Sequence, residues 1–156
     1  MVINYFSFVI GGICTSYILY PISEFEFHSR YRYIFILLIM ASMVTQLLYV
    51  GFPNPVYYIW TASLTNGIQN AMSSLYSHGQ YRTTHITGLT TDLSIYFGQK
   101  IHQDDSHQPK LNLWLSSLMG LLIGSFLGIA SLHVLGIYCF IPTVIGYTLF
   151  LFFLKH

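Results

Sequence analysis

Residues 63–99 read SLTNGIQNAMSSLYSHGQYRTTHITGLTTDLSIYFGQ and link the end of a long uncharged segment to a shorter, more polar one. The uncharged segment covers Pro55–Tyr76 and contains no Asp, Glu, Lys or Arg. As one helix it would rise about 33 Å, which is enough to cross the hydrocarbon core of a bilayer. We therefore predict a membrane-length helix over Pro55–Tyr76, with the rest of the chain arranged around it.

This predicted helix carries a polar stripe. Its members recur at spacings of three and four, which places them along one face: Ser63, Asn66, Asn70, Ser73 and Ser77, with Gly67 and Gln69 beside them. Amide groups facing hydrocarbon would lose several hydrogen bonds, so the stripe is predicted to face other helices, water or a substrate. One interpretation is polar contact between helices alone, and the other is the lining of a cavity or substrate site. The density of the stripe favours the cavity, because helix association needs fewer polar groups.

A second helix is predicted over Thr84–Lys100. Its apolar stripe is Ile86, Leu89, Leu93, Tyr96 and Phe97, and its opposite stripe is Thr84, Thr87, Gly88, Thr91 and Asp92. It is too polar for a lipid-facing span, and its threonine-rich start next to Arg82 leaves backbone N–H groups that attract anions. Only a short loop separates this helix from Pro55–Tyr76. We therefore expect the two helices to pack as a hairpin, with the Asn66–Asn70 and Thr84–Asp92 faces lining one shared cavity.

The composition is that of an integral membrane protein. Of its 156 residues, 54% are hydrophobic and only 7% are charged, whereas a soluble domain carries about a quarter charged residues. The mean hydropathy is +0.58. A net charge of +1 without a basic cluster gives nucleic-acid binding no electrostatic basis. Cys14 and Cys139 lie in apolar runs, where a thiol is usually a small buried group, so no disulfide framework or redox motif is predicted.

Five membrane-spanning helices are predicted, in an all-α fold. The segments are Met1–Tyr20, interpreted as a retained span rather than a signal peptide, Tyr33–Phe52, Pro55–Tyr76, Leu111–Ser131 and Val134–Leu154. One face of the second span is polar and compatible with lining the same interior: Ser42, Thr45, Gln46 and Tyr49. Gly120, Gly124 and Gly128 share a face of the fourth span, which predicts close helix packing against another helix of the chain or a second copy. Pro142 is expected to kink the fifth span.

The distribution of charge predicts an orientation. If Thr84–Lys100 does not cross the membrane, all 6 Lys and Arg residues fall on one side. The positive-inside rule then places the N-terminus outside and the C-terminus in the cytoplasm, with Thr84–Lys100 re-entrant or interfacial on the cytoplasmic side. The loop His102–Lys110 holds His and Asp side chains but no metal-ligand spacing, so we interpret it as a hydrated connector and predict no metal site.

The chain resembles the YoaK-type family of bacterial multi-pass membrane proteins, whose function is unknown. The resemblance rests on Gly67-x-Gln69-Asn70, on Arg82-Thr83-Thr84-x-x-Thr87-Gly88 and on the glycine-rich Leu111–Ser131 span, and it covers essentially the whole chain. It implies a tandem repeat in the bacterial inner membrane, with residues 1–52 as the tail of a first unit and residues 55–154 as a complete second unit. Family members usually open with a further segment, so the resemblance also implies a chain that is short at its N-terminus. Three spans per unit would give the two units opposite orientations, as in inverted-repeat transporters.

From these features we expect a small-solute transporter or permease, with the lipid bilayer and an unknown solute as its partners. The predicted substrate-binding residues are Asn66, Gln69, Asn70, Arg82, Thr83, Thr84, Thr87, Gly88 and Asp92. In this interpretation Arg82 and the helix start favour an anionic group, and Asp92 binds a proton or cation. The alternative is a non-transporting structural or interaction protein that needs a partner chain or a second copy. An enzyme is disfavoured and no cofactor is expected, since His85 and Asp92 share a helix face without a nucleophile or metal-ligand motif.

Overall fold

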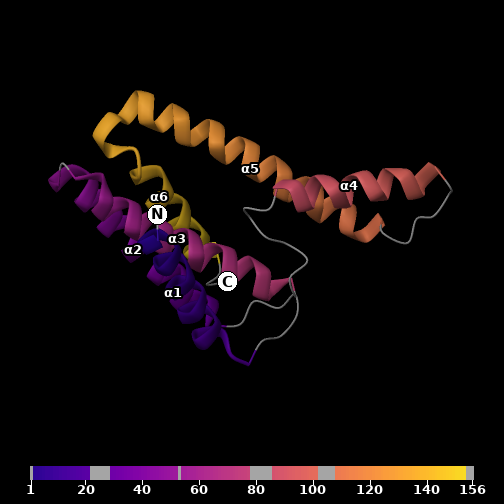
Figure 1. The fold of residues 1–156 in the computed structure, drawn as a ribbon, viewed down its shortest axis with the longest axis horizontal. Coiled ribbons are helices and arrows are strands. Elements are labelled where there is room, and N and C mark those ends of the chain that lie inside the picture. The colour runs from indigo at the N-terminus through magenta and orange to yellow at the C-terminus, as the bar shows by residue number, and fades with distance from the viewer. Residues whose placement is uncertain (1, 22–28, 53, 78–85, 102–107, 154–156) are drawn as a thin grey trace.

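A computed structural model describes residues 2–21, 29–52, 54–77, 86–101 and 108–153 of the chain. Over these residues the fold is all-α, as predicted, and no strand is present. The elements are α1 (Val2–Leu19), α2 (Tyr31–Gly51), α3 (Pro55–Tyr76), α4 (Ile86–Ile101), α5 (Gln108–Leu135), the 3-10 helix η1 (Gly136–Tyr138) and α6 (Ile141–Phe153). Figure 1 shows α1, α2, α3 and α6 together as a bundle, with α5 and α4 extending away from it as an arm.

The helix α3 has the predicted bounds and lies at the centre of the packing. Its start is capped by Asn54, whose side chain accepts a hydrogen bond of 3.0 Å from the N–H of Val56. Pro55 occupies the first turn, where a helix makes no use of the missing N–H. The core between α3, α1 and α2 consists of Leu19, Tyr31, Ile34, Phe35, Leu38 and Ile68. α6 packs on α2, where the ring of Phe35 stacks on that of Phe150.

Glycines bring α1 and α3 into backbone contact. A Cβ built on Gly11 would lie 2.5 Å from the carbonyl oxygen of Leu64, and one built on Gly67 would overlap the backbone of Phe8. Thr15 is fully buried beside this contact, and its hydroxyl donates to the carbonyl oxygen of Gly11 at 2.9 Å. The small residues of α1 therefore make a close helix contact, and Gly67 is their counterpart on α3.

The directions of the helices sort the connections to two ends of the bundle. α1 and α3 run parallel, because successive residues of α1 meet successive residues of α3. α2 and α6 run antiparallel, with Tyr49 beside Phe140 at one end and Phe35 beside Phe150 at the other. The start of α1, the α2–α3 turn and the α5–α6 turn therefore share one end. Arg30, at the start of α2, lies at the opposite end.

One side chain holds the α5–α6 turn against α2. Gln46 donates from Nε2 to the carbonyl oxygen of Ile137 at 2.6 Å, and its Oε1 accepts from the N–H of Phe140 at 3.1 Å. Gly136, at φ +53°, follows the end of α5 with the left-handed backbone that favours glycine. The turn thus comes later in the chain than expected. Pro142 lies in the first turn of α6, so the expected kink within a longer helix is not formed.

The helix α4 packs on α5, which corrects the expected hairpin of α3 with α4. Leu93 and Tyr96 of α4 are buried together with Trp114 of α5, and Leu118 packs against them. This contact buries the centre of the apolar stripe of α4, while Phe97 at its end stays exposed. The polar stripe of α4 is therefore under no constraint to turn towards α3.

The glycine face of α5 has no close partner among the described helices. A Cβ on Gly120, Gly124 or Gly128 would meet no described atom within 4 Å. No described helix of this chain packs closely on that face, and the close backbone contact lies instead between Gly11 and Gly67. Small residues permit a close approach but do not supply the partner, so packing of this face against a second copy stays a prediction.

Among the described residues, three helices are long and apolar enough to cross a membrane: Val2–Leu19, Tyr31–Gly51 and Trp114–Tyr138. α3 has the length, with 22 residues, but its polar stripe lowers its hydropathy. α6 has 13 residues and rises about 20 Å, which is less than the bilayer core of about 30 Å. Length and hydropathy together thus support three of the five predicted spans.

Candidate functional site

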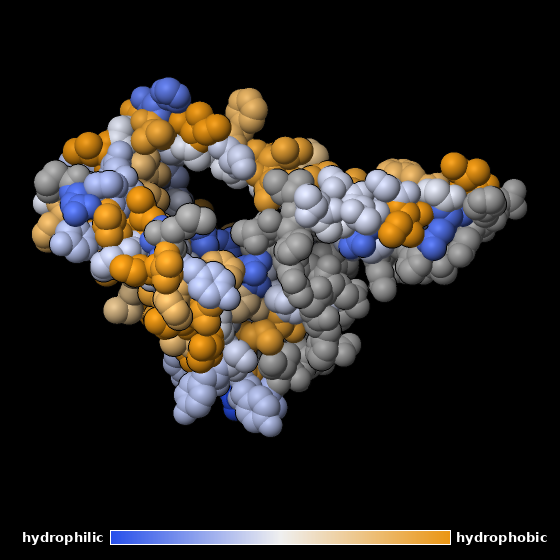
Figure 2. All heavy atoms as spheres, in the orientation of Figure 1, coloured by the Kyte–Doolittle hydropathy of each residue, from blue (hydrophilic) through white to orange (hydrophobic). Residues whose placement is uncertain are grey.

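A cavity of about 670 Å³ lies between α5 and the bundle. Figure 2 shows the molecule hollowed there, with hydrophilic side chains at the lower edge of the hollow. The cavity is lined by Ser42 and Thr45 from α2, Ala62, Thr65, Asn66 and Gln69 from α3, Ser117, Gly120, Leu121, Gly124 and Ser125 from α5, and Phe140, Thr143 and Tyr147 at α6. Its volume lies within the range of about 300–1,000 Å³ that is typical of small-molecule sites.

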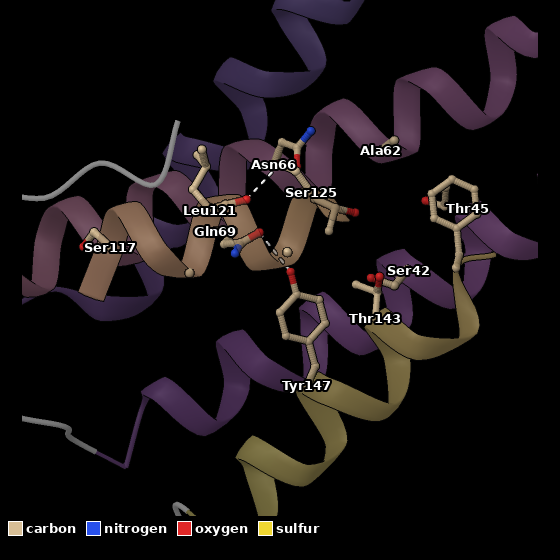
Figure 3. Close-up of a pocket in the computed structure, with 14 residues that line it drawn as sticks. Ser42, Thr45, Ala62, Asn66, Gln69, Ser117, Leu121, Ser125, Thr143 and Tyr147 are labelled. Atoms are coloured by element: carbon tan, nitrogen blue, oxygen red, sulfur yellow. Dashed lines mark hydrogen bonds between the residues drawn. The ribbon is translucent and has the colours of Figure 1, made fainter. Parts of the chain in front are cut away.

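The helix α3 turns one face towards this cavity, formed by Ala62, Thr65, Asn66 and Gln69 (Figure 3). Spacings of three and four keep these side chains on one side of the helix. Two predicted site residues, Asn66 and Gln69, are therefore brought together here, whereas Asn70 is not among the lining residues. The cavity face is thus displaced around the helix from the stripe predicted by polarity alone.

The hydroxyl groups between α2 and α3 are mostly satisfied within the protein. Thr45 Oγ1 lies 2.8 Å from the carbonyl oxygen of Ala41 and 2.9 Å from Oγ1 of Thr61. Thr65 donates to the carbonyl oxygen of Thr61 at 2.9 Å. Ser42 differs, because it is only 3% exposed and its Oγ has no hydrogen-bond partner among the described residues. A buried polar group left in that state costs about 1–3 kcal/mol. The Ser42 Oγ is itself buried, so the residue lines the cavity without presenting this oxygen to it.

Tyr147 joins α6 to α3 at the cavity. Its hydroxyl donates to Oε1 of Gln69 at 3.0 Å, as the dashed line in Figure 3 marks. Because Oε1 is engaged in this way, the amide nitrogen is the group through which Gln69 can donate to another molecule. Thr143, one turn earlier on α6, adds a hydroxyl to the same lining.

The helix α5 contributes a wall of small groups. Gly120 and Gly124 line the cavity, and Ser125 beside them donates from Oγ to the carbonyl oxygen of Leu121 at 2.8 Å. The open space around these two glycines is the cavity itself, so their role here is to leave volume rather than to pack a helix. Gly128 is not among the lining residues.

Three further predicted site residues are not brought to the cavity. Thr87, Gly88 and Asp92 lie on α4, and none of them lines it. Arg82, Thr83 and Thr84 fall outside the described residues. The described part of the Thr84–Asp92 face therefore does not line this cavity, and the start of that face lies outside the described residues. At the cavity, α3 faces α2, α5 and α6, while α4 is occupied by its packing on α5.

Sequence reasoning anticipated the α2 side of the lining and missed the α5 and α6 sides. Ser42 and Thr45 belong to the polar face predicted for the second span, and both line the cavity. Thr143 and Tyr147 were overlooked, although two polar groups four residues apart in an otherwise apolar helix are the signal of an inward face.

The described lining combines apolar surface with uncharged polar groups. None of the described lining residues is Asp, Glu, Lys, Arg or His. Across the part of the chain that the structure describes, no group of three or more His, Cys, Asp or Glu side chains is placed to hold a metal ion. The chemistry available to a ligand in this cavity is therefore hydrogen bonding to hydroxyl and amide groups.

An all-α chain with apolar helices of membrane length and a polar cavity between them has the features of a polytopic membrane protein. The chain belongs to the family described as "Protein of unknown function (DUF1275)", whose model matches residues 2–153. Comparison with curated proteins and with solved structures gave no significant match. Membership of an uncharacterised family agrees with the resemblance inferred from the sequence, and it leaves the activity to be argued from the site.

Proposed function

We propose that the protein is a small-solute transporter or permease that binds its substrate in the cavity between α2, α3, α5 and α6. The observation that carries the proposal is the cavity of about 670 Å³ between these helices, whose described lining includes hydroxyl- and amide-bearing residues of α2, α3, α5 and α6. Polar groups that serve only helix association bond to one another. A polar group in a solute site is instead left for the solute, and such groups inside membrane helices mark solute pathways.

The position of the cavity supports this proposal. Ser42, Asn66 and Tyr147 come from the middle turns of α2, α3 and α6, so the cavity lies near the centre of the helices. Transporter sites typically lie near the bilayer midplane, where one group of helices rocks against another to give alternating access. α5 is suited to be the moving group, because its contacts with the bundle are concentrated at the turn that Gln46 holds.

The proposal includes the bacterial inner membrane, with the N-terminus outside and the C-terminus in the cytoplasm. The α2–α3 turn and the α5–α6 turn lie at one end of the bundle and carry no Lys or Arg, whereas Arg30 lies at the other end. The positive-inside rule assigns the end with Arg30 to the cytoplasm. Residues 1–52 and 55–154 would then belong to two successive repeat units of a YoaK-type, inverted-repeat architecture.

Uptake by proteoliposomes containing the purified protein tests transport across a panel of labelled sugars, polyols, amides, amino acids and carboxylates. We expect flux of at least one solute, lost in Gln69→Leu and kept in Thr91→Val. Gln69 lines the cavity, whereas Thr91 bonds to its own helix on α4. The absence of flux for the whole panel, or equal flux in the two variants, would contradict the proposal.

A non-transporting interaction protein is the second candidate, favoured by α5. Over Trp114–Tyr138, 0% of the apolar window of this helix is buried inside the chain, and its glycine face is open. Glycines on one helix face allow a second helix to approach closely. In this interpretation a second copy covers α5, and a disulfide would form between copies of Gly128→Cys in detergent. A monomer without that crosslink, together with solute flux, decides for the transporter.

A further inference from the structure

We propose that the cavity selects uncharged solutes that carry hydroxyl or amide groups. This inference rests on the proposed transport function and names the class of substrate. It differs from the anionic substrate expected from the sequence. Of the two groups invoked there for charge, Asp92 lies on α4 and does not line the cavity, and Arg82 lies outside the described residues.

The described lining offers no countercharge. It consists of hydroxyl, amide, aromatic, aliphatic and glycine groups, and none of these described residues carries a charge at neutral pH. A charged solute that enters at the depth of a bilayer centre loses its hydration and needs a partner of opposite sign. None of the described lining side chains supplies one, so the described part of the site favours uncharged solutes.

The wall offers both donors and acceptors of hydrogen bonds. The amide nitrogen of Gln69 is a donor, and its Oε1 accepts from Tyr147. Hydroxyl-bearing residues of α2, α5 and α6 also line the cavity, and a hydroxyl group both donates and accepts. A hydroxyl group or an amide in the solute can accept from the Gln69 nitrogen and donate to such a hydroxyl, whereas an apolar solute can do neither.

The α5 side of the cavity provides space for a solute. Gly120 and Gly124 keep that wall free of side chains, and no described atom lies within 4 Å of where their Cβ atoms would be. The remaining volume of about 670 Å³ accommodates a solute of several heavy atoms with accompanying water. The cavity therefore combines polar recognition on α2, α3 and α6 with room on α5.

Cysteine reactivity measures this selectivity while the solute itself is still unidentified. Ser125→Cys on the cavity wall and Leu127→Cys on the exposed side of α5 are compared in a Cys14→Ala/Cys139→Ala background, in detergent. The probes are methanethiosulfonates of similar size that carry a hydroxyethyl, propyl, sulfonatoethyl or trimethylammonioethyl group. Ser29→Cys, exposed before α2, corrects for the intrinsic rates of the four reagents.

At Ser125→Cys we expect the hydroxyethyl reagent to react about tenfold or more faster than either charged reagent, after correction with Ser29→Cys. We also expect the ratio of hydroxyethyl to propyl rates to be about tenfold higher at Ser125→Cys than at Leu127→Cys, because only the cavity offers hydrogen bonds. Comparing the hydroxyethyl-to-propyl ratio at the two positions removes the effect of the reagents' different partition into the detergent.

Each other outcome overturns a defined part of the account. Equal rates for charged and hydroxyethyl reagents at Ser125→Cys would overturn the selection of uncharged solutes and leave transport itself standing. An equal hydroxyethyl-to-propyl ratio at the two positions would remove the preference for polar solutes. If no reagent reaches Ser125→Cys while Ser29→Cys reacts, the cavity admits no solute, and the transport proposal fails with the inference.

Discussion

The hydroxyl of Tyr147 on α6 donates a hydrogen bond of 3.0 Å to Oε1 of Gln69 on α3. This bond ties together two helices that are far apart in the sequence, and it lies at the cavity wall. Tyr147→Phe removes the donor and leaves the ring in place, so we expect the free energy of unfolding to fall by about 1 kcal/mol. Thermal unfolding in detergent measures the change.

Tyr138→Phe is the matched control for that substitution. Tyr138 belongs to η1, and its side chain is half exposed. We expect no measurable change in its unfolding temperature. Equal effects of Tyr147→Phe and Tyr138→Phe would show that the bond to Gln69 adds nothing to the stability of the helix arrangement.

The backbone contact between α1 and α3 predicts an asymmetry among glycines. Gly67→Ala and Gly11→Ala place a methyl group against the backbone of the facing helix, which cannot move aside as a flexible side chain would. We expect each to destabilise the protein by about 1–3 kcal/mol or more, the usual cost of overpacking.

Gly124→Ala is the control, because its methyl group meets no described atom within 4 Å. It should be neutral or slightly stabilising, since alanine favours a helix over glycine by about 1 kcal/mol. Chemical denaturation in mild detergent compares the three variants. A loss of stability in Gly124→Ala that matches Gly67→Ala would place a close helix contact on α5 after all.

The helices were predictable because helix length and hydropathy are local properties. The run from Pro55 to Tyr76 starts with a capping Asn54 and a proline in the first turn, and α3 has the predicted bounds. Gly136 shows the limit of this reasoning. A glycine inside an apolar run can be helical or can end the helix, and only the contact of the turn with Gln46 decides between them.

The site was less predictable because the choice of partner helices is non-local. Gln69 and Asn70 are neighbours on a polar helix, and about 100° of rotation separates them. Their polarity does not reveal which one faces the cavity. Gly120 and Gly124 illustrate the same problem, because a small side chain is equally compatible with a tight helix contact and with an open wall.

The bonds from Gln46 to the α5–α6 turn predict a local effect on dynamics. Gln46→Leu removes the acceptor of the Phe140 N–H and the donor to the Ile137 carbonyl oxygen. We expect amide hydrogen exchange in residues 136–140 to accelerate by about tenfold, while the middle of α2 remains protected. Leu47→Ala, on the exposed side of α2, is the control. Unchanged exchange in the turn would mean that other contacts hold α5 in place.

The orientation inferred from charge predicts which loops are accessible from each side. In cells, Phe52→Cys should react with a membrane-impermeant thiol reagent from outside. Ser29→Cys, at the end of the bundle with Arg30, should react only after permeabilisation. Both variants need the Cys14→Ala/Cys139→Ala background. Labelling of Ser29→Cys from outside in intact cells would reverse the topology.

The central claim, that solute passes through the cavity between α5 and the bundle, is tested most directly by filling the cavity. Gly124→Phe projects a ring into it from an open wall, whereas Gly128→Phe places the same ring on the same helix outside the lining. Flux into proteoliposomes is measured for both variants, with unfolding temperatures as the check on folding. The account predicts that Gly124→Phe abolishes the flux of uncharged polar solutes while Gly128→Phe keeps it, at similar unfolding temperatures. Equal flux in the two variants would contradict it.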